Sequence, residues 1–154
     1  MKKISIIAGI LLCLHLILAP MTTQAAVEGT AADDTLYYET VIEESTPAPS
    51  FATYAAKTKT GYKTTYCKNA SGKVLWSVKV TANFSYNGTT ATCTSVSVST
   101  TVSDSSWKIS NKYTTRCSNY GTATATADNY SKGKVINTIT KTVKLTCSPN
   151  GTLS

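Results

Sequence analysis

Histidine is almost absent from this 154-residue chain, and its four glutamates all lie within the first 44 residues. The only histidine is His15, and no glutamate follows Glu44. Because His15 falls in an apolar N-terminal stretch, the rest of the chain has no histidine, which is the usual general base near neutral pH. After Glu44 the only side-chain carboxylates are Asp104 and Asp128, and both would have to face one cleft in a two-carboxylate glycosidase. Their neighbours indicate a turn and a strand end instead, so we predict that the protein is not an enzyme.

The sequence also lacks the short motifs that organise catalytic and metal sites. It has no GxSxG, no glycine-rich phosphate loop and no HExxH. Serines and lysines are plentiful, but no recognisable motif arranges them as a nucleophile and its base. The imidazoles and carboxylate clusters that bind metals are missing as well. We therefore expect no metal and no cofactor.

Good helix formers are scarce in the second half of the chain. Leu, Glu, Gln and Met are nearly absent there, whereas Ser, Thr, Val, Ala and Tyr dominate. This composition predicts an all-β domain. A domain of about 100 residues is the usual size of a single β-sandwich.

The chain has one long apolar run, from Ile4 to Leu18, preceded by two lysines and followed by small residues. It is shorter than the roughly 20 residues needed to span a bilayer. The pattern predicts a signal peptide over residues 1–25, cleaved after Ala25. We expect a secreted or extracellular protein, released or held noncovalently at the cell surface. The short Lys-Lys signal looks bacterial.

Signal cleavage removes Cys13 and leaves four cysteines, Cys67, Cys93, Cys117 and Cys147. An even number in a small exported domain predicts two disulfides. Pairing Cys67 with Cys117 and Cys93 with Cys147 is preferred, and Cys67–Cys147 with Cys93–Cys117 stays open because spacing does not determine connectivity. A zinc site is disfavoured because no CxxC occurs.

Charge changes sign near residue 50. Residues 26–50 hold six acids and no base, and residues 51–154 hold thirteen bases and two acids. Prolines at 47 and 49 disfavour both helix and strand pairing. We expect a flexible acidic leader over 26–56 that acts as a spacer or as a pro-segment masking the basic domain over 57–154. A short strand or helical turn docking on the domain stays open for this leader.

The clearest strand signal is Val74–Tyr86, where every even position is apolar. Asn87-Gly88 follows and predicts a tight hairpin turn. In the returning strand the apolar phase changes, so we predict a β-bulge between Cys93 and Val96 that turns both toward the core.

A second hairpin is predicted around Ser131-Lys132-Gly133, with glycine in a three-residue loop. Its register places an alanine row on the same face as four apolar residues of the returning strand: Ala123, Ala125 and Ala127 with Val135, Ile139, Val143 and Leu145. Trp76 and Trp107 are the expected core aromatics. The small row is suited to accept large side chains from an opposing sheet.

About seven strands with turn signals between them predict an immunoglobulin-like or related Greek-key β-sandwich, with a small closed β-barrel as the alternative. The expected strands are Gly61–Cys67, Val74–Tyr86, Thr89–Val102, Ser106–Ser110, Lys112–Cys117, Tyr120–Tyr130 and Lys134–Cys147.

Positive charge is the conspicuous chemical property of the domain. Lysine suits diffuse attraction to phosphate or carboxylate polymers better than base reading, so no specific nucleic-acid partner is expected. We predict a secreted binding module that associates electrostatically with anionic cell-envelope or extracellular polymers. The alternatives are a cationic antimicrobial or toxin-like protein with an acidic pro-segment, and an adhesin or matrix subunit. The candidate contacts are Lys63, Lys73, Lys79, Lys108, Lys112, Arg116, Lys132, Lys134, Lys141 and Lys144.

Threonine also recurs with strand periodicity near the C-terminus. We expect two threonine rows on adjacent strands. They could form a flat surface that binds ice or glycans, or they could simply face solvent. They are Thr122, Thr124 and Thr126 in one row and Thr138, Thr140, Thr142 and Thr146 in the other.

Overall fold

The computed structural model describes residues 35–45 and 56–154. The predicted signal peptide, the first part of the leader and residues 46–55 lie outside the described residues. Within these ranges no helix is long and apolar enough to cross a membrane. The described chain forms seven strands: β1 (Tyr37–Glu44), β2 (Lys57–Lys68), β3 (Val74–Tyr86), β4 (Ala91–Val102), β5 (Trp107–Cys117), β6 (Tyr120–Ser131) and β7 (Lys134–Thr146).

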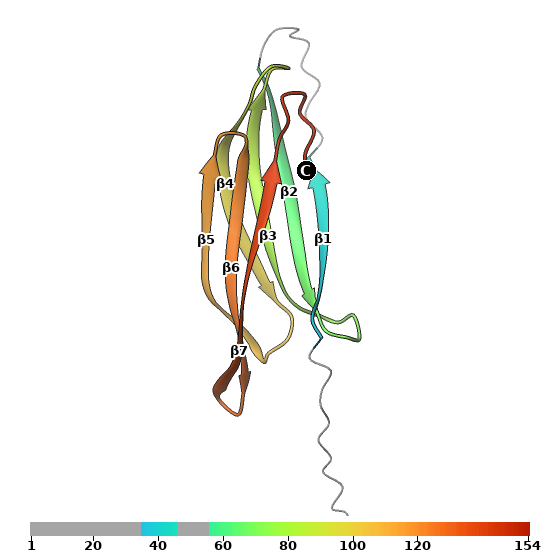
Figure 1. The fold of residues 1–154 in the computed structure, drawn as a ribbon, viewed down its shortest axis with the longest axis vertical. Helices are drawn as coiled ribbons and strands as arrows, with labels where there is room; N and C mark the ends of the chain where they lie inside the picture. The colour runs from blue at the N-terminus through green and yellow to red at the C-terminus, as the bar shows by residue number, and fades with distance from the viewer. Residues whose placement is uncertain (1–34, 46–55) are drawn as a thin grey trace, which may run out of the picture. The chain divides into compact units, whose positions relative to one another are not determined.

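The seven strands form two antiparallel sheets, which confirms the all-β prediction. Sheet A has the order β1-β2-β3-β4, and sheet B has the order β5-β6-β7 (Figure 1). One apolar cluster contains buried side chains from both sheets. Neither sheet closes on itself, so the closed barrel offered as the alternative is not the fold.

The predicted immunoglobulin-like or Greek-key order is wrong for the described strands. In both sheets, strands that are neighbours in space are consecutive in the chain, so each sheet is a meander. Every connection from β2 onward is two to five residues long. A Greek key needs a long return connection, whereas short links keep each strand beside the preceding one or carry it to the facing sheet. Turn signals did not determine the order of the strands. The matching count of seven is coincidental, because two expected segments form the single strand β5 and β1 comes from the expected leader.

Part of the predicted leader belongs to the sandwich. Its residues Tyr37–Glu44 form β1, which pairs antiparallel with β2 along its whole length. β1 lies in the same compact unit as the other strands. Of the options the sequence left open for this segment, a docked strand is the one found.

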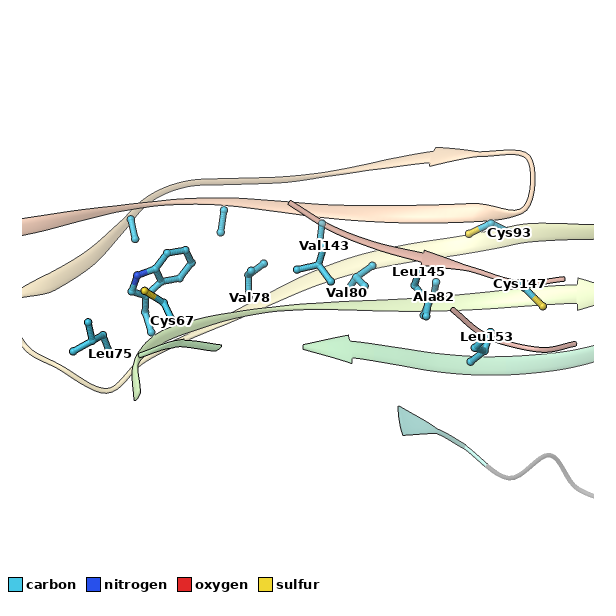
Figure 2. Packing of buried hydrophobic residues seen from close by; sticks show 14 of the residues in the cluster. Cys67, Leu75, Val78, Val80, Ala82, Cys93, Val143, Leu145, Cys147 and Leu153 are labelled. Atoms are coloured by element: carbon cyan, nitrogen blue, oxygen red, sulfur yellow. The ribbon is translucent and has the colours of Figure 1, made fainter. Parts of the chain in front are cut away.

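The core is built from a large-residue strand facing a small-residue strand. On β3 the inward residues Trp76, Val78, Val80, Ala82 and Phe84 are at most 1% exposed. On β6 the three alanines predicted as the accepting row are fully buried in the same cluster. Trp76 packs against Trp107 with ring centroids 6.3 Å apart, as expected of core aromatics. Figure 2 shows Val78 and Val80 of β3 beside Val143 and Leu145 of β7.

The β3–β4 hairpin contains the predicted bulge. Phe84 pairs with Cys93 and Asn83 with Ser95, which leaves Thr94 as the extra residue. Cys93 is thereby buried, and Val96 becomes half-buried on the core side. Four residues connect the two strands. Within this connection the Asn87 amide donates to the Thr90 carbonyl at 3.2 Å, and the Asn87 side-chain carbonyl accepts hydrogen bonds from the amides of both Thr89 and Thr90.

The β6–β7 hairpin differs from its predicted form. Its loop is the two residues Lys132 and Gly133, both with positive φ (49° and 78°), as a type I′ turn requires. The register then shifts because Ile136 is an extra residue between paired positions. Val135 pairs with Tyr130 and is 49% exposed, so its predicted core position is wrong.

Two further predicted strand boundaries change. The segments expected at Ser106–Ser110 and Lys112–Cys117 form the single strand β5, whose register shifts between Ile109 and Asn111. β2 begins at Lys57, four residues earlier than expected, because it continues to pair with β3 as far as Tyr86.

Candidate anion-binding surface

Positive charge is unequally divided between the two halves of the sandwich. Residues 106–154, which form sheet B and the C-terminal segment, hold seven bases and one acid, a net charge of +6. The described residues up to 105, which form sheet A and its turns, hold six bases and four acids, a net charge of +2. The strand β1 contributes three of those acids. Uncompensated charge is therefore concentrated on sheet B.

The outward side of sheet B carries the two predicted threonine rows, and we call it the threonine face. Thr122, Thr124 and Thr126 of β6 alternate with the buried alanines and pair with residues of β7. The hydroxyls of Thr124 and Thr142 lie 2.8 Å apart, and those of Thr126 and Thr140 lie 2.9 Å apart. Cross-strand hydroxyl pairs of this kind stabilise a sheet. Thr140 and Thr142 are exposed and Thr126 is half-buried on this face, whereas Thr124 is only 3% exposed.

Two lysines on the threonine face lie against tyrosine rings. The Lys144 ammonium is 3.9 Å from the Tyr120 ring centroid, and the Lys108 ammonium is 4.9 Å from that of Tyr130. Cation–π contact restrains each ammonium at the surface while its N–H donors still face solvent. Tyr113, 53% exposed, lies on β5 of the same sheet. The one acid of this face, Asp128, accepts a hydrogen bond from Thr138 at 2.7 Å.

Four predicted bases of sheet B lie away from the threonine face. Lys132 and Lys134 are exposed at the β6–β7 turn. Lys112 and Arg116 pair with Ala125 and Gly121, on the inward side of the edge strand β5. The Arg116 guanidinium donates to the backbone carbonyl of Thr94 on β4.

The other four predicted bases, Lys63, Lys73, Lys79 and Lys141, lie on sheet A or on the inward side of β7. Lys63 is opposite Val80 and Lys141 is opposite Ala125, so both are on the inward sides of their sheets and half-buried. The Lys141 ammonium lies 3.4 Å from the Tyr38 ring centroid. The Lys79 ammonium lies 4.6 Å from the Tyr62 ring centroid on the outward side of sheet A. The ten predicted residues therefore do not form one patch.

Lys73 is already paired with a carboxylate. Its ammonium lies 2.7 Å from Oδ2 of Asp104, whose Oδ1 accepts hydrogen bonds from the backbone amide and hydroxyl of Ser106. The hydrogen bond from Lys73, followed by those from Ser106, holds the pKa of Asp104 well below its usual value. Asp104 therefore stays ionised and partly cancels the charge of Lys73.

Sequence reasoning missed the ionic contacts between β1 and β2. The Lys59 ammonium lies 3.0 Å from Oε2 of Glu44 and donates to the Gly151 carbonyl at 2.6 Å. Lys68 forms an ion pair with Glu39. A sequence signal for these ion pairs was present, since an acidic segment precedes a lysine-rich strand. The register between the two segments is determined by strand pairing, which the pattern of a single strand does not reveal.

No disulfide joins any of the four described cysteines, so the two predicted disulfides are not shown. Cys67 pairs with Trp76, which contacts Trp107 at the start of β5. Cys117 is at the other end of this eleven-residue strand, about 30 Å from Trp107 at roughly 3.3 Å per residue. Figure 2 likewise shows Cys67 at one end of the cluster and Cys147 at the other. Neither predicted partner of Cys67 is within reach in this fold.

The remaining three cysteines lie at the opposite end of the sandwich from Cys67. The amides of Cys93 and Cys147 donate to the carbonyls of the adjacent residues Ser118 and Asn119, at 2.7 and 2.9 Å. A bridge from Cys93 to Cys147 or to Cys117 stays a prediction. Burial raises the pKa of the Cys67, Cys93 and Cys147 thiols, which keeps them in the poorly nucleophilic protonated form.

Within residues 35–45 and 56–154, no group of three or more His, Cys, Asp or Glu side chains could hold a metal ion. The chain matches no protein-family model, no curated protein and no solved structure in comparisons with known proteins. A functional assignment therefore depends on the surface described above.

Proposed function

We propose that the protein is an exported, noncatalytic binding module that associates electrostatically with anionic cell-envelope or extracellular polymers through the threonine face. The observation that carries the proposal is the pair of exposed lysines restrained over Tyr120 and Tyr130 on a threonine-lined sheet face with one acid. Ammonium groups supply the charge. In the Thr126–Thr140 pair only one hydroxyl donates to the other, so the second hydroxyl can donate to a phosphate or carboxylate oxygen.

Salt dependence tests this proposal directly. The purified protein is expected to be retained on immobilised polyphosphate at low salt and to elute as salt rises, because exposed charges are screened within about 8 Å at physiological ionic strength. The measurement is the elution position in a salt gradient, with an uncharged dextran matrix as the control. Absence of retention, or elution that does not change with salt, would contradict the electrostatic mechanism.

A second candidate function is a cationic antimicrobial or toxin-like protein restrained by its acidic segment. The contacts of β1 favour it, because Glu39 and Glu44 are paired with Lys68 and Lys59. In this proposal β1 lowers the affinity of the domain for anionic surfaces until the segment is removed or displaced. All of its residues are exposed, so its release would break the pairing with β2 and the contact between Tyr38 and Lys141 but would remove no buried side chain of β1 from the core.

We expect the double variant Glu39→Gln/Glu44→Gln to bind polyphosphate about fivefold more tightly than the parent protein at low salt, because about 1 kcal/mol of competing attraction is removed. The measurement is a binding titration at two salt concentrations. Glu43→Gln is the control, since the described residues give Glu43 no ion pair. Equal affinities of the parent and the double variant would refute masking by β1.

A further inference from the structure

The β6–β7 turn forms a projecting end of the sandwich. We call residues 131–137 the hairpin tip. Figure 1 shows that it extends past the β2–β3 and β4–β5 connections at the same end. Pairing between β5 and β6 stops at Asn129 and Trp107, so the tip projects beyond the edge of its own sheet.

The hairpin tip exposes two neighbouring apolar side chains, Val135 and Ile136, which are 49% and 62% exposed. In a regular strand, successive side chains point to opposite faces, and one of the two would point inward. Ile136 has no partner in the β6–β7 register, and this extra residue breaks the alternation. The break lies past the point where β5 stops pairing with β6, so β5 does not cover it. Both side chains therefore meet solvent at the end of the molecule.

Positive charge surrounds these apolar residues. Lys132 and Lys134 flank the turn glycine and are exposed, and residues 131–137 contain no acid. Tyr130, just before the tip, carries the Lys108 ammonium over its ring. The tip thus combines a small apolar end with lysines immediately beside it.

We propose that the hairpin tip inserts into the interface of an anionic lipid bilayer. Apolar side chains that enter the boundary between headgroups and acyl chains, with lysines at the headgroup level, give reversible binding that depends on anionic lipid. The lysines and the apolar pair are adjacent in sequence, so one shallow insertion satisfies both. This inference goes beyond the polymer binding proposed above, because it uses different residues and a lipid surface.

A bilayer fits the tip better than a protein partner does. Two side chains on a narrow turn offer far less than the roughly 800 Å² per partner of a stable protein interface. Anionic lipid headgroups supply the complementary negative charge. Each lysine near such a surface increases the affinity for the membrane about fivefold. A fluid interface also needs no shape match to a convex tip.

The test is co-sedimentation of the purified protein with vesicles of phosphatidylcholine containing phosphatidylglycerol, compared with phosphatidylcholine alone. The parent protein is expected to bind the anionic vesicles only. Val135→Ser/Ile136→Ser should weaken this binding at least tenfold, because apolar transfer into the interface is removed. Lys132→Gln/Lys134→Gln should weaken it about thirtyfold.

The matched control is Val41→Ser/Ile42→Ser, which removes one valine and one isoleucine of 37% and 41% exposure from β1. It should bind vesicles like the parent protein. The serine pair at the tip should also leave polyphosphate retention unchanged, which separates failure of this proposal from failure of polymer binding. No binding of the parent protein to anionic vesicles, or an equal reduction in the tip and control variants, would overturn the proposal.

Discussion

Replacing Phe84 with alanine is expected to lower the free energy of unfolding by about 3–5 kcal/mol, because removal of a buried aromatic ring leaves a cavity. Phe84 is fully buried on β3, opposite Cys93 at the bulge. Single domains of this size are stable by only about 5–15 kcal/mol, so the variant would lose a large share of its stability. Urea unfolding followed by far-UV circular dichroism measures the change.

Ser99→Ala is the control for this prediction. Ser99 is exposed on β4 and pairs with Lys79, so its replacement should change the free energy of unfolding by less than about 0.5 kcal/mol. If Phe84→Ala were as stable as the control, β3 would not be the central strand of the core. A low yield of Phe84→Ala does not by itself measure stability. The parent protein and both variants are therefore purified and unfolded at equal concentration.

Single-strand periodicity predicted the elements of this fold well. The bounds Val74–Tyr86 and the bulge after Cys93 are as expected, because a buried face imposes period-two alternation and a phase change needs an inserted residue. The order of strands was not predictable in this way, since a meander and a Greek key use the same strand and turn signals. β1 was uncertain because its residues are exposed throughout and show little alternation.

The sequence predicted which residues the candidate surface contains, but not which of its charges are unpaired. The sequence identified the bases and the threonine rows, and alternation put Thr122, Thr124 and Thr126 opposite the alanines. Which lysines are free depends on contacts between distant residues, such as Lys73 with Asp104 and Lys68 with Glu39. Both pairs join segments more than 25 residues apart, so no local pattern contains them.

Charge reversal on the threonine face should have the largest effect on polymer binding. Lys108→Glu/Lys144→Glu lowers the net charge by about four and replaces two attractions with repulsions. We expect affinity for polyphosphate at low salt to fall about a hundredfold, and the slope of log affinity against log salt to decrease by about two. Both lysines are exposed and lie on the surface of tyrosine rings, so the fold should be retained.

The matched control for this reversal is Lys57→Glu/Lys79→Glu, which makes the same change in net charge on sheet A. If the threonine face is the binding surface, the affinity of the control should fall about tenfold or less, from weaker long-range attraction alone. Equal reductions in the two variants would mean that net charge binds the polymer without a preferred face. A titration at several salt concentrations distinguishes these outcomes. Removing ammonium–phosphate pairs decreases the slope, so the slope should decrease by about two for the threonine-face variant and by less for the sheet A control.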